Sequence, residues 1–292
     1  MANKKYLKAI SVILIVGMIL AGCQFEEKIN ANDTKVASDT KTTLEEVKEL
    51  TDMFGNENSD TVIINTQGGP MTKLETDEFK EIVSNFNTEG LLMVNVHQYQ
   101  TINPSKFMND EISFEEAIQY DKESIEILYK IIKYYKNQNK KVYVLGISFG
   151  AFMTQELIAE KGIDVADKYL IMVGRLDMNE SFWKGFSEGK DGYFKNGVEP
   201  MLIDNKNVEQ KNMFKLASGL GQNRYTEKLK KYDLAKITYV YGKADEAVGK
   251  LTDEEVAFLK SKNANVIAGE GNHCVAAMGC IVEGAKTAFG ID

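Results

Sequence analysis

The sequence predicts an α/β fold: a mostly parallel sheet of about six or more strands, flanked by helices, with a helical cap insertion. Six short, apolar, β-branched runs recur along the chain, at residues 61–66, 91–97, 141–146, 168–174, 237–242 and 265–269. Near-continuous apolar runs of this length are typical of strands buried on both faces. The segments between them carry apolar residues at helical spacing. Strand–helix alternation of this kind indicates a parallel sheet covered on both sides.

The chain begins with a segment that is typical of targeting rather than of a fold. Three lysines precede an apolar run of about 13 residues, too short to span a bilayer comfortably and suited to a signal peptide: Lys4, Lys5 and Lys8. The "LAGC" that follows ends at Cys23 and resembles the lipobox of bacterial lipoproteins. The resemblance implies a signal peptide over residues 1–22, lipidation of the Cys23 sulfur, and anchoring at the extracytoplasmic face of the cell membrane. An ordinary secretory signal and an N-terminal anchor helix are the alternatives.

Residues 23–41 are polar and lack periodicity, which predicts a flexible tether ahead of a domain over residues 42–292. The formal charge of −8 becomes more negative by three when the lysines of the signal segment are removed. An acidic surface of this kind repels nucleic acid, so we expect no nucleic-acid partner. No obligate protein partner is evident.

Local signals place the elements of this domain in order. A helix is expected over residues 42–55, ended by Gly55, and others around residues 79–86 and 125–135. "TDEE" at residues 252–255 has the pattern of a capping box at a helix start. Residues 175–232 have no clear strand, and we interpret them as the helical cap. Most of its aromatic residues are expected to pack its own small core: Phe182, Trp183, Phe186, Tyr193, Phe194 and Phe214.

A G-x-S-x-G match places Ser148 between a predicted strand and a predicted helix. That strand–turn–helix setting is what the motif needs in order to present a nucleophilic serine. Side chains two residues before and after the serine would collide across so tight a turn, which accounts for Gly146 and Gly150. The helix that follows points its N-terminus at the serine, and the amide of Phe149 is free to donate a hydrogen bond.

A serine nucleophile needs a base, and the base needs an acid to orient it. The chain has two histidines, and His273 directly follows the last predicted strand. Asp245 follows the preceding strand and is the candidate acid, with Glu246 beside it and Asp177, after an earlier strand, as alternatives. His97 is expected to border the pocket or to be incidental.

The turn "NTQGGP" at residues 65–70 follows the first of the apolar runs. It resembles the H-G-G-P turn of α/β-hydrolases, with Gln67 in place of the usual histidine. Together with the elbow at Ser148, the acid and the histidine, each at the end of a strand, it gives a resemblance to the α/β-hydrolase superfamily over about residues 60–290. The order Ser148, Asp245, His273 is the order of that superfamily. The match implies that the amides of Gly69 and Phe149 form the oxyanion hole.

The resemblance implies a serine hydrolase, carboxylesterase-like, that cleaves a small-molecule acyl substrate through an acyl-enzyme. We expect no cofactor and no metal, because the chain lacks a clustered Cys/His ligand set and "NTQGGP" lacks the Lys-Ser/Thr of a P-loop. A peptidase of proline-iminopeptidase type is one alternative, and a non-catalytic, ligand-binding surface lipoprotein on the same fold is another.

Cys274 and Cys280 lie six residues apart in a predicted helix. Six residues rise about 9 Å along a helix, beyond the ~7 Å that a disulfide tolerates between Cα atoms. We therefore expect two buried free thiols.

Overall fold

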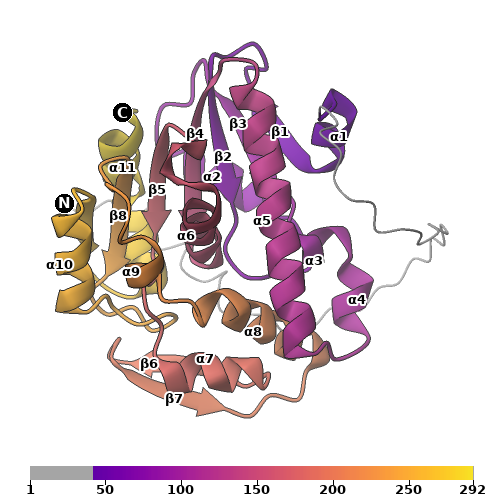
Figure 1. Ribbon diagram of the computed structural model, residues 1–292, viewed down its shortest axis with the longest axis vertical. Coiled ribbons are helices and arrows are strands. Elements are labelled where there is room, and N and C mark those ends of the chain that lie inside the picture. The colour runs from indigo at the N-terminus through magenta and orange to yellow at the C-terminus, as the bar shows by residue number, and fades with distance from the viewer. Residues whose placement is uncertain (1–41, 292) are drawn as a thin grey trace. The chain divides into compact units, whose positions relative to one another are not determined.

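The computed structural model describes residues 42–291 (Figure 1). The predicted signal peptide, the lipidation site at Cys23 and the tether lie outside these residues. Within residues 42–291, no helix is long and apolar enough to cross a membrane.

A seven-stranded sheet in the order β1-β3-β2-β4-β5-β8-β9 forms the centre of the domain. All neighbouring strands are parallel except β1, which pairs antiparallel with β3. The strands are β1 (Thr51–Gly55), β2 (Thr61–Thr66), β3 (Leu92–Val96), β4 (Lys141–Ile147), β5 (Lys168–Met172), β8 (Ile237–Gly242) and β9 (Asn265–Gly269). The predicted fold class is confirmed, and each of the six predicted runs is a strand of this sheet.

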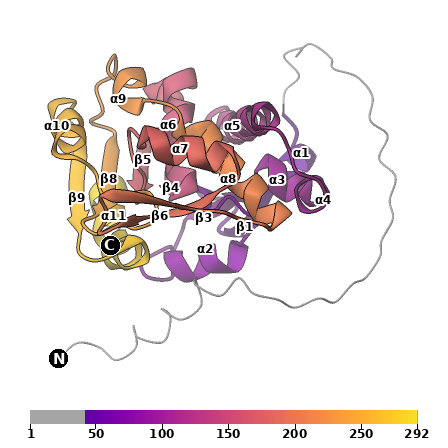
Figure 2. The ribbon, with the colours of Figure 1, turned by 90° about the horizontal axis from the view of Figure 1, so that it is seen from below.

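Alternating residues of the strands form two separate cores, one on each face of the sheet. In β2, Val62 and Ile64 belong to one core and Ile63 belongs to the other. The first core packs against α5 (Phe114–Lys136) and α6 (Phe149–Lys161), and the second against α2 (Thr76–Val83) and α11 (His273–Phe289). Figure 2 shows these two helix pairs on opposite sides of the sheet. Burial on both faces explains why the strands between the two edges of the sheet are apolar almost throughout.

The remaining helices are short or lie at the periphery of the sheet. They are α1 (Leu44–Glu49), α3 (Tyr99–Ile102), α4 (Pro104–Met108) and α10 (Asp253–Ser261), with a 3₁₀ turn at Ile163–Val165. The capping box at the start of α10 is present as predicted: the Thr252 side chain accepts from the Glu255 N–H, and the Glu255 side chain accepts from the Thr252 N–H.

The first predicted helix is wrong beyond Glu49. The chain leaves α1 and forms the edge strand β1, so Gly55 ends a strand rather than a helix. Its φ is +94°, and a Cβ there would lie 2.4 Å from the carbonyl oxygen of Leu91. Antiparallel pairing with β3 therefore overrides the helical pattern of the local sequence.

The cap over residues 175–232 contains a β-hairpin as well as helices. Its elements are α7 (Glu180–Ser187), β6 (Asp191–Lys195), β7 (Glu199–Ile203), α8 (Val208–Gly221) and α9 (Tyr225–Lys228). Asn196 and Gly197 turn the hairpin with φ values of 55° and 71°, a conformation that Asn and Gly tolerate best. The expectation of helices alone missed this turn, although "NG" is a strong hairpin signal.

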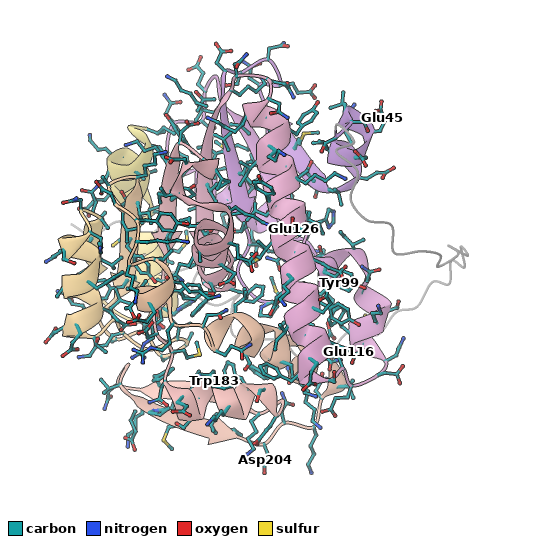
Figure 3. The ribbon with its side chains drawn as sticks, viewed as in Figure 1. Glu45, Tyr99, Glu116, Glu126, Trp183 and Asp204 are labelled. Carbon is teal, nitrogen blue, oxygen red and sulfur yellow. The ribbon has the colours of Figure 1, made fainter. Side chains whose placement is uncertain are left out.

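The aromatic residues of the cap form its own core, as expected for most of them. Phe182, Phe186 and Phe194 are buried together, with Phe214 packed against them. Tyr193, on the opposite face of β6, is 41 % exposed. Figure 3 labels Trp183 on α7 and Asp204 after β7, both within the cap.

Two buried polar side chains of α8 fasten the cap to the segment before α5. Asn212 is fully buried; its Nδ2 donates to the carbonyl oxygens of Phe107 and Asp110, and its Oδ1 accepts from the Ile112 N–H. One turn later, the Lys215 ammonium donates to the Ile112 carbonyl at 2.7 Å. These contacts satisfy every polar atom of the Asn212 amide group. The hydrogen bonds therefore offset the cost of removing that group from water.

Where Gly219 of α8 packs against α5, an acidic side chain of α5 is buried. Asp121 of α5 is 3 % exposed, and its Oδ2 has no hydrogen-bond partner within the described chain. Gly219 of α8 lies directly against it, since a Cβ at that position would come within 2.0 Å of Oδ2. Burial raises the pKa of the Asp121 carboxyl well above its usual range, and the nearby charge of Glu156 raises it further.

The first prediction concerns this carboxyl. Because its pKa is raised, the folded protein holds the proton more tightly than the unfolded chain, so the group costs stability as the pH rises above the unfolded pKa of about 3.9. Asp121→Asn should therefore raise the Tm near neutral pH, and the gain should shrink as the pH falls towards that value. A gain of about 1 kcal/mol corresponds to roughly 2–4 °C for a domain of this size. Thermal unfolding followed by circular dichroism across the pH range measures it.

Asp204→Asn is the matched control, because Asp204 is exposed and its removal changes the net charge equally. A Tm that falls equally at acid and neutral pH in Asp121→Asn would contradict the assignment of Asp121 as an uncompensated buried acid.

Candidate active site

Ser148 occupies a strained turn between the central strand β4 and α6. Its φ of 56° and ψ of −114° lie outside the regions that non-glycine residues ordinarily adopt. The Ser148 N–H donates to the Met172 carbonyl at 2.9 Å, which fixes the turn to the end of β5. The side chain is half-buried.

The two glycines of the motif are needed because backbone passes on both sides of the turn. A Cβ at Gly150 would lie 1.8 Å from the Thr66 carbonyl oxygen, and one at Gly146 would lie 2.3 Å from Thr154 Oγ1. These distances are far below van der Waals contact, so any larger residue would displace the turn. The collision expected across the turn is present at Gly146, whose added Cβ would also lie 2.4 Å from the Gly150 carbonyl oxygen.

The glycine turn after β2 passes beside the serine. A Cβ at Gly68 would lie 3.4 Å from the Cβ of Ser148. Gly69 has a φ of +117°, and a Cβ there would lie 2.7 Å from the backbone nitrogen of Met71. Phe149 is the first residue of α6, so its N–H has no acceptor within the helix. The structure thus brings the Gly68–Gly69 turn and the N-terminus of α6 to the same residue, Ser148.

Gln67 and Gln98 hold this turn in place. The Gln67 side chain accepts from the Glu75 N–H at 2.8 Å and donates to the Lys73 carbonyl at 2.9 Å. Gln98, fully buried after β3, donates to the Gln67 carbonyl at 3.2 Å. Gln67, which stands where the turn that it resembles has a histidine, therefore ties the ends of its own loop together. Gln98 carries no signal of this role in the sequence, because the role depends on β3 lying next to β2.

Asp245 and His273 are brought together at the same edge of the sheet. Asp245 Oδ2 lies 2.8 Å from His273 Nδ1, with the carboxyl side chain 2 % exposed and the imidazole 13 % exposed. The other carboxyl oxygen, Oδ1, accepts from the N–H groups of Ala247 at 2.9 Å and Val248 at 3.0 Å. A carboxylate at Nδ1 holds the proton on that nitrogen and leaves Nε2 with a free lone pair.

The two alternative acids have other contacts. Asp177 accepts from Arg224 at 2.9 Å and from the Thr226 hydroxyl at 2.6 Å, so it fastens the start of α9 to the base of the cap. Glu246 Oε2 accepts the backbone N–H of His273 at 3.0 Å and does not contact the ring. Asp245 is therefore the carboxylate that orients the imidazole.

His97 lies after β3, and its Nδ1 is 2.9 Å from the Thr101 hydroxyl. Burial lowers its pKa, with a smaller opposing effect from Asp52. The described contacts connect it to neither Ser148 nor Asp245, which agrees with an incidental position.

The two described cysteines are free, as expected. Cys280 is buried, whereas Cys274 is half-buried rather than buried. Burial raises the pKa of the Cys274 thiol, and the carboxylates of Glu246 and Asp245 raise it further. A thiol in such surroundings is a poor nucleophile, although it directly follows His273. In residues 42–291, no group of three or more His, Cys, Asp or Glu side chains could hold a metal ion.

Comparison with known proteins gives fold relatives alone. No family model and no curated protein matches the chain. DcsB in complex with its substrate analogue superposes with a TM-score of 0.54 at 12 % identity, over 81 % of this chain and 92 % of that one. TT1662 from Thermus thermophilus gives 0.53 at 13 % identity, over 84 % and 94 %. MGS-M2, an α/β hydrolase enzyme from a Medee basin deep-sea metagenome library, gives 0.51 at 11 % identity, over 81 % and 91 %.

This chain has the α/β-hydrolase fold. The fold agrees with the resemblance found in the sequence, and it places Ser148, Asp245 and His273 after parallel strands at the carboxyl edge of one sheet. Ligands of open α/β sheets bind at this edge. Fold alone does not determine activity, which depends on the residues of the site.

Proposed function

We propose that this α/β-hydrolase is a serine hydrolase that cleaves a carboxylic ester or related acyl bond through an acyl-enzyme. The observation that carries the proposal is the 2.8 Å contact between Asp245 and His273, on the same sheet edge as a serine held at positive φ. A buried carboxylate directed at one imidazole nitrogen is the arrangement that makes histidine a base for a hydroxyl nucleophile.

The proposed reaction has two halves. His273 Nε2 takes the proton of Ser148 Oγ as that oxygen attacks the acyl carbonyl carbon, and a tetrahedral oxyanion forms. The intermediate collapses, the bond to the leaving group breaks, and the imidazolium gives its proton to the leaving oxygen or nitrogen. Water, deprotonated by the same histidine, then attacks the acyl-serine carbonyl carbon. The bond to Ser148 Oγ breaks, the imidazolium returns its proton to that oxygen, and the carboxylic acid is released. Asp245 stabilises the imidazolium in both halves.

Backbone amides are the proposed stabilisers of the oxyanion. Phe149 supplies the first N–H of α6, and Gly69 supplies an N–H from the turn beside the serine. Donors of this kind are worth about 3–4 kcal/mol each in comparable sites. The Gln67 and Gln98 hydrogen bonds support the second donor, because they fix the loop that carries it.

The proposed enzyme is a lipoprotein anchored through Cys23. Support comes from the sequence: the lysines, the apolar run and "LAGC". A thioether-linked diacylglycerol buries two acyl chains, at about 0.8 kcal/mol per CH₂, which is enough for stable anchoring.

The second prediction tests the nucleophile. Ser148→Ala should abolish labelling by a fluorophosphonate probe and reduce kcat on any substrate by orders of magnitude, because no other hydroxyl replaces the attacking atom. Gel fluorescence and turnover of a panel of esters and aminoacyl amides measure both effects. The amides are included because the Gln67–Pro70 turn resembles that of proline iminopeptidases. Undiminished labelling at another serine would refute the assignment, and tight ligand binding without turnover in the wild type would favour a binding protein.

The third prediction tests the acid. Asp245→Asn should reduce kcat by about 10⁴, because the imidazole loses its orienting acceptor and adopts the wrong tautomer. Asp177→Asn is the matched control: it removes the same charge from a residue that binds Arg224 and Thr226 instead. If Asp177→Asn is the more damaging change, Asp245 is not the acid.

The fourth prediction tests the anchor. The native protein should fractionate with membranes and partition into detergent, and Cys23→Ser should abolish lipidation and the cleavage that depends on it. Mass spectrometry of the mature N-terminus gives the direct measurement. A mature N-terminus away from Cys23 would contradict this proposal without affecting the proposed chemistry.

A further inference from the structure

The loop after β8 contacts the candidate histidine in two ways. Asp245 binds the imidazole ring through Oδ2, and Glu246 binds the backbone of the same histidine, since its Oε2 accepts the His273 N–H at 3.0 Å. His273 is the first residue of α11, so this N–H has no acceptor within the helix. A carboxylate is also favoured there by the positive end of the helix dipole. Two consecutive residues thus fix both the ring and the main chain of His273.

The same loop is fastened to the hairpin of the cap. The Phe194 N–H donates to the backbone carbonyl of Glu246 at 2.7 Å, and the Lys250 N–H donates to the carbonyl of Gly197 at 2.9 Å. Gly197 lies so close that an added Cβ would be 3.3 Å from Ala244 and from the Asp245 nitrogen. The hairpin therefore contacts the loop before, beside and after the acid.

Buried side chains reinforce this contact. Phe194 is 1 % exposed, and the Arg175 guanidinium lies over its ring, 5.5 Å from the centroid. Arg175 also donates to the Val248 carbonyl at 3.4 Å. Gly249, at a φ of +80°, brings the loop within 3.1 Å of the Phe194 ring, measured from an added Cβ. The contact is packed as well as hydrogen-bonded, and it involves the face of β6 opposite the exposed Tyr193.

We propose that Glu246 is a positioning residue for His273, and that the cap hairpin acts through it to hold the Asp245–His273 pair. Glu246 is hydrogen-bonded to both the hairpin and the histidine: its backbone carbonyl accepts from the Phe194 N–H, and its carboxylate accepts from the His273 N–H. The proposal rests on the proposed function, in which His273 is the base. It assigns the cap a role in turnover that does not depend on contact with substrate.

The experiment compares matched variants of the full chain. Glu246→Ala removes the acceptor for the His273 N–H, whereas Glu246→Gln keeps an oxygen at that place without the charge. Glu270→Ala controls for loss of a nearby negative charge, because Glu270 is exposed and paired with Lys243. Phe194→Ala loosens the hairpin on the loop, and Tyr193→Ala truncates its solvent-facing neighbour. Fluorescence of Trp183, the single tryptophan, reports whether the cap stays folded.

The expected result is a loss of turnover without loss of binding. Glu246→Ala and Phe194→Ala should lower kcat about tenfold to a hundredfold, the cost of misplacing a catalytic group by about 1 Å, with little change in KM. Glu246→Gln should restore most of the activity, and Glu270→Ala and Tyr193→Ala should behave as wild type. Wild-type kcat in Glu246→Ala, or equal damage in Glu246→Gln and Glu246→Ala, would overturn the proposal.

A second measurement does not depend on the reaction. Hydrogen exchange at the His273 amide should be faster in Glu246→Ala and Phe194→Ala than in wild type, Glu246→Gln and Tyr193→Ala. If the wild type neither reacts with fluorophosphonate nor turns over any substrate, the proposed function fails, and exchange alone then decides whether the hairpin and Glu246 hold His273. Unchanged exchange in Glu246→Ala would refute the positioning contact in either case.

Discussion

The close approach of the Ser148 turn to the end of β2 is the constraint on which the candidate site depends. Gly150 lies directly against the Thr66 carbonyl, and the Thr66 hydroxyl donates to the Gly150 carbonyl at 2.9 Å. Only glycine permits this approach. It places the N-terminus of α6 next to the end of β2, where Gly68 lies beside Ser148. The Gly68–Gly69 turn and Ser148 are thus held beside each other by the contact between Gly150 and Thr66, which is set by the parallel register of β2 and β4.

The strands of the sheet could be predicted from sequence because burial on both faces leaves a continuous apolar run. The edge strand β1 could not, because its residues continue the helical pattern of α1. The hairpin could have been found from Asn196–Gly197, but β6 and β7 are short and carry Gly192 and Pro200, which weaken a strand pattern.

Ser148, Asp245 and His273 could be selected as candidates from the sequence because the serine motif is local and the chain has only two histidines. The contact between Asp245 and His273 links residues after different strands, and their order along the chain was enough to suggest it. The hydrogen bonds of Gln98 and Glu246 gave no such signal. A buried glutamine that donates to a backbone carbonyl leaves no spacing to detect, and Glu246 could be interpreted only as a substitute for the acid beside it.

The cap is held to the rest of the domain at several separated places, and this limits how it could move. Asn212 of α8 makes three hydrogen bonds to the segment before α5, two of them buried, and the hairpin binds the loop that carries Asp245. Rigid-body opening would break both sets, and each buried polar group left unpaired costs about 1–3 kcal/mol. Opening of the whole cap is therefore unfavourable, and smaller motions belong to parts without such contacts, such as the exposed Ile203 end of β7. The cap is better suited to brace the Asp245–His273 pair than to act as a lid.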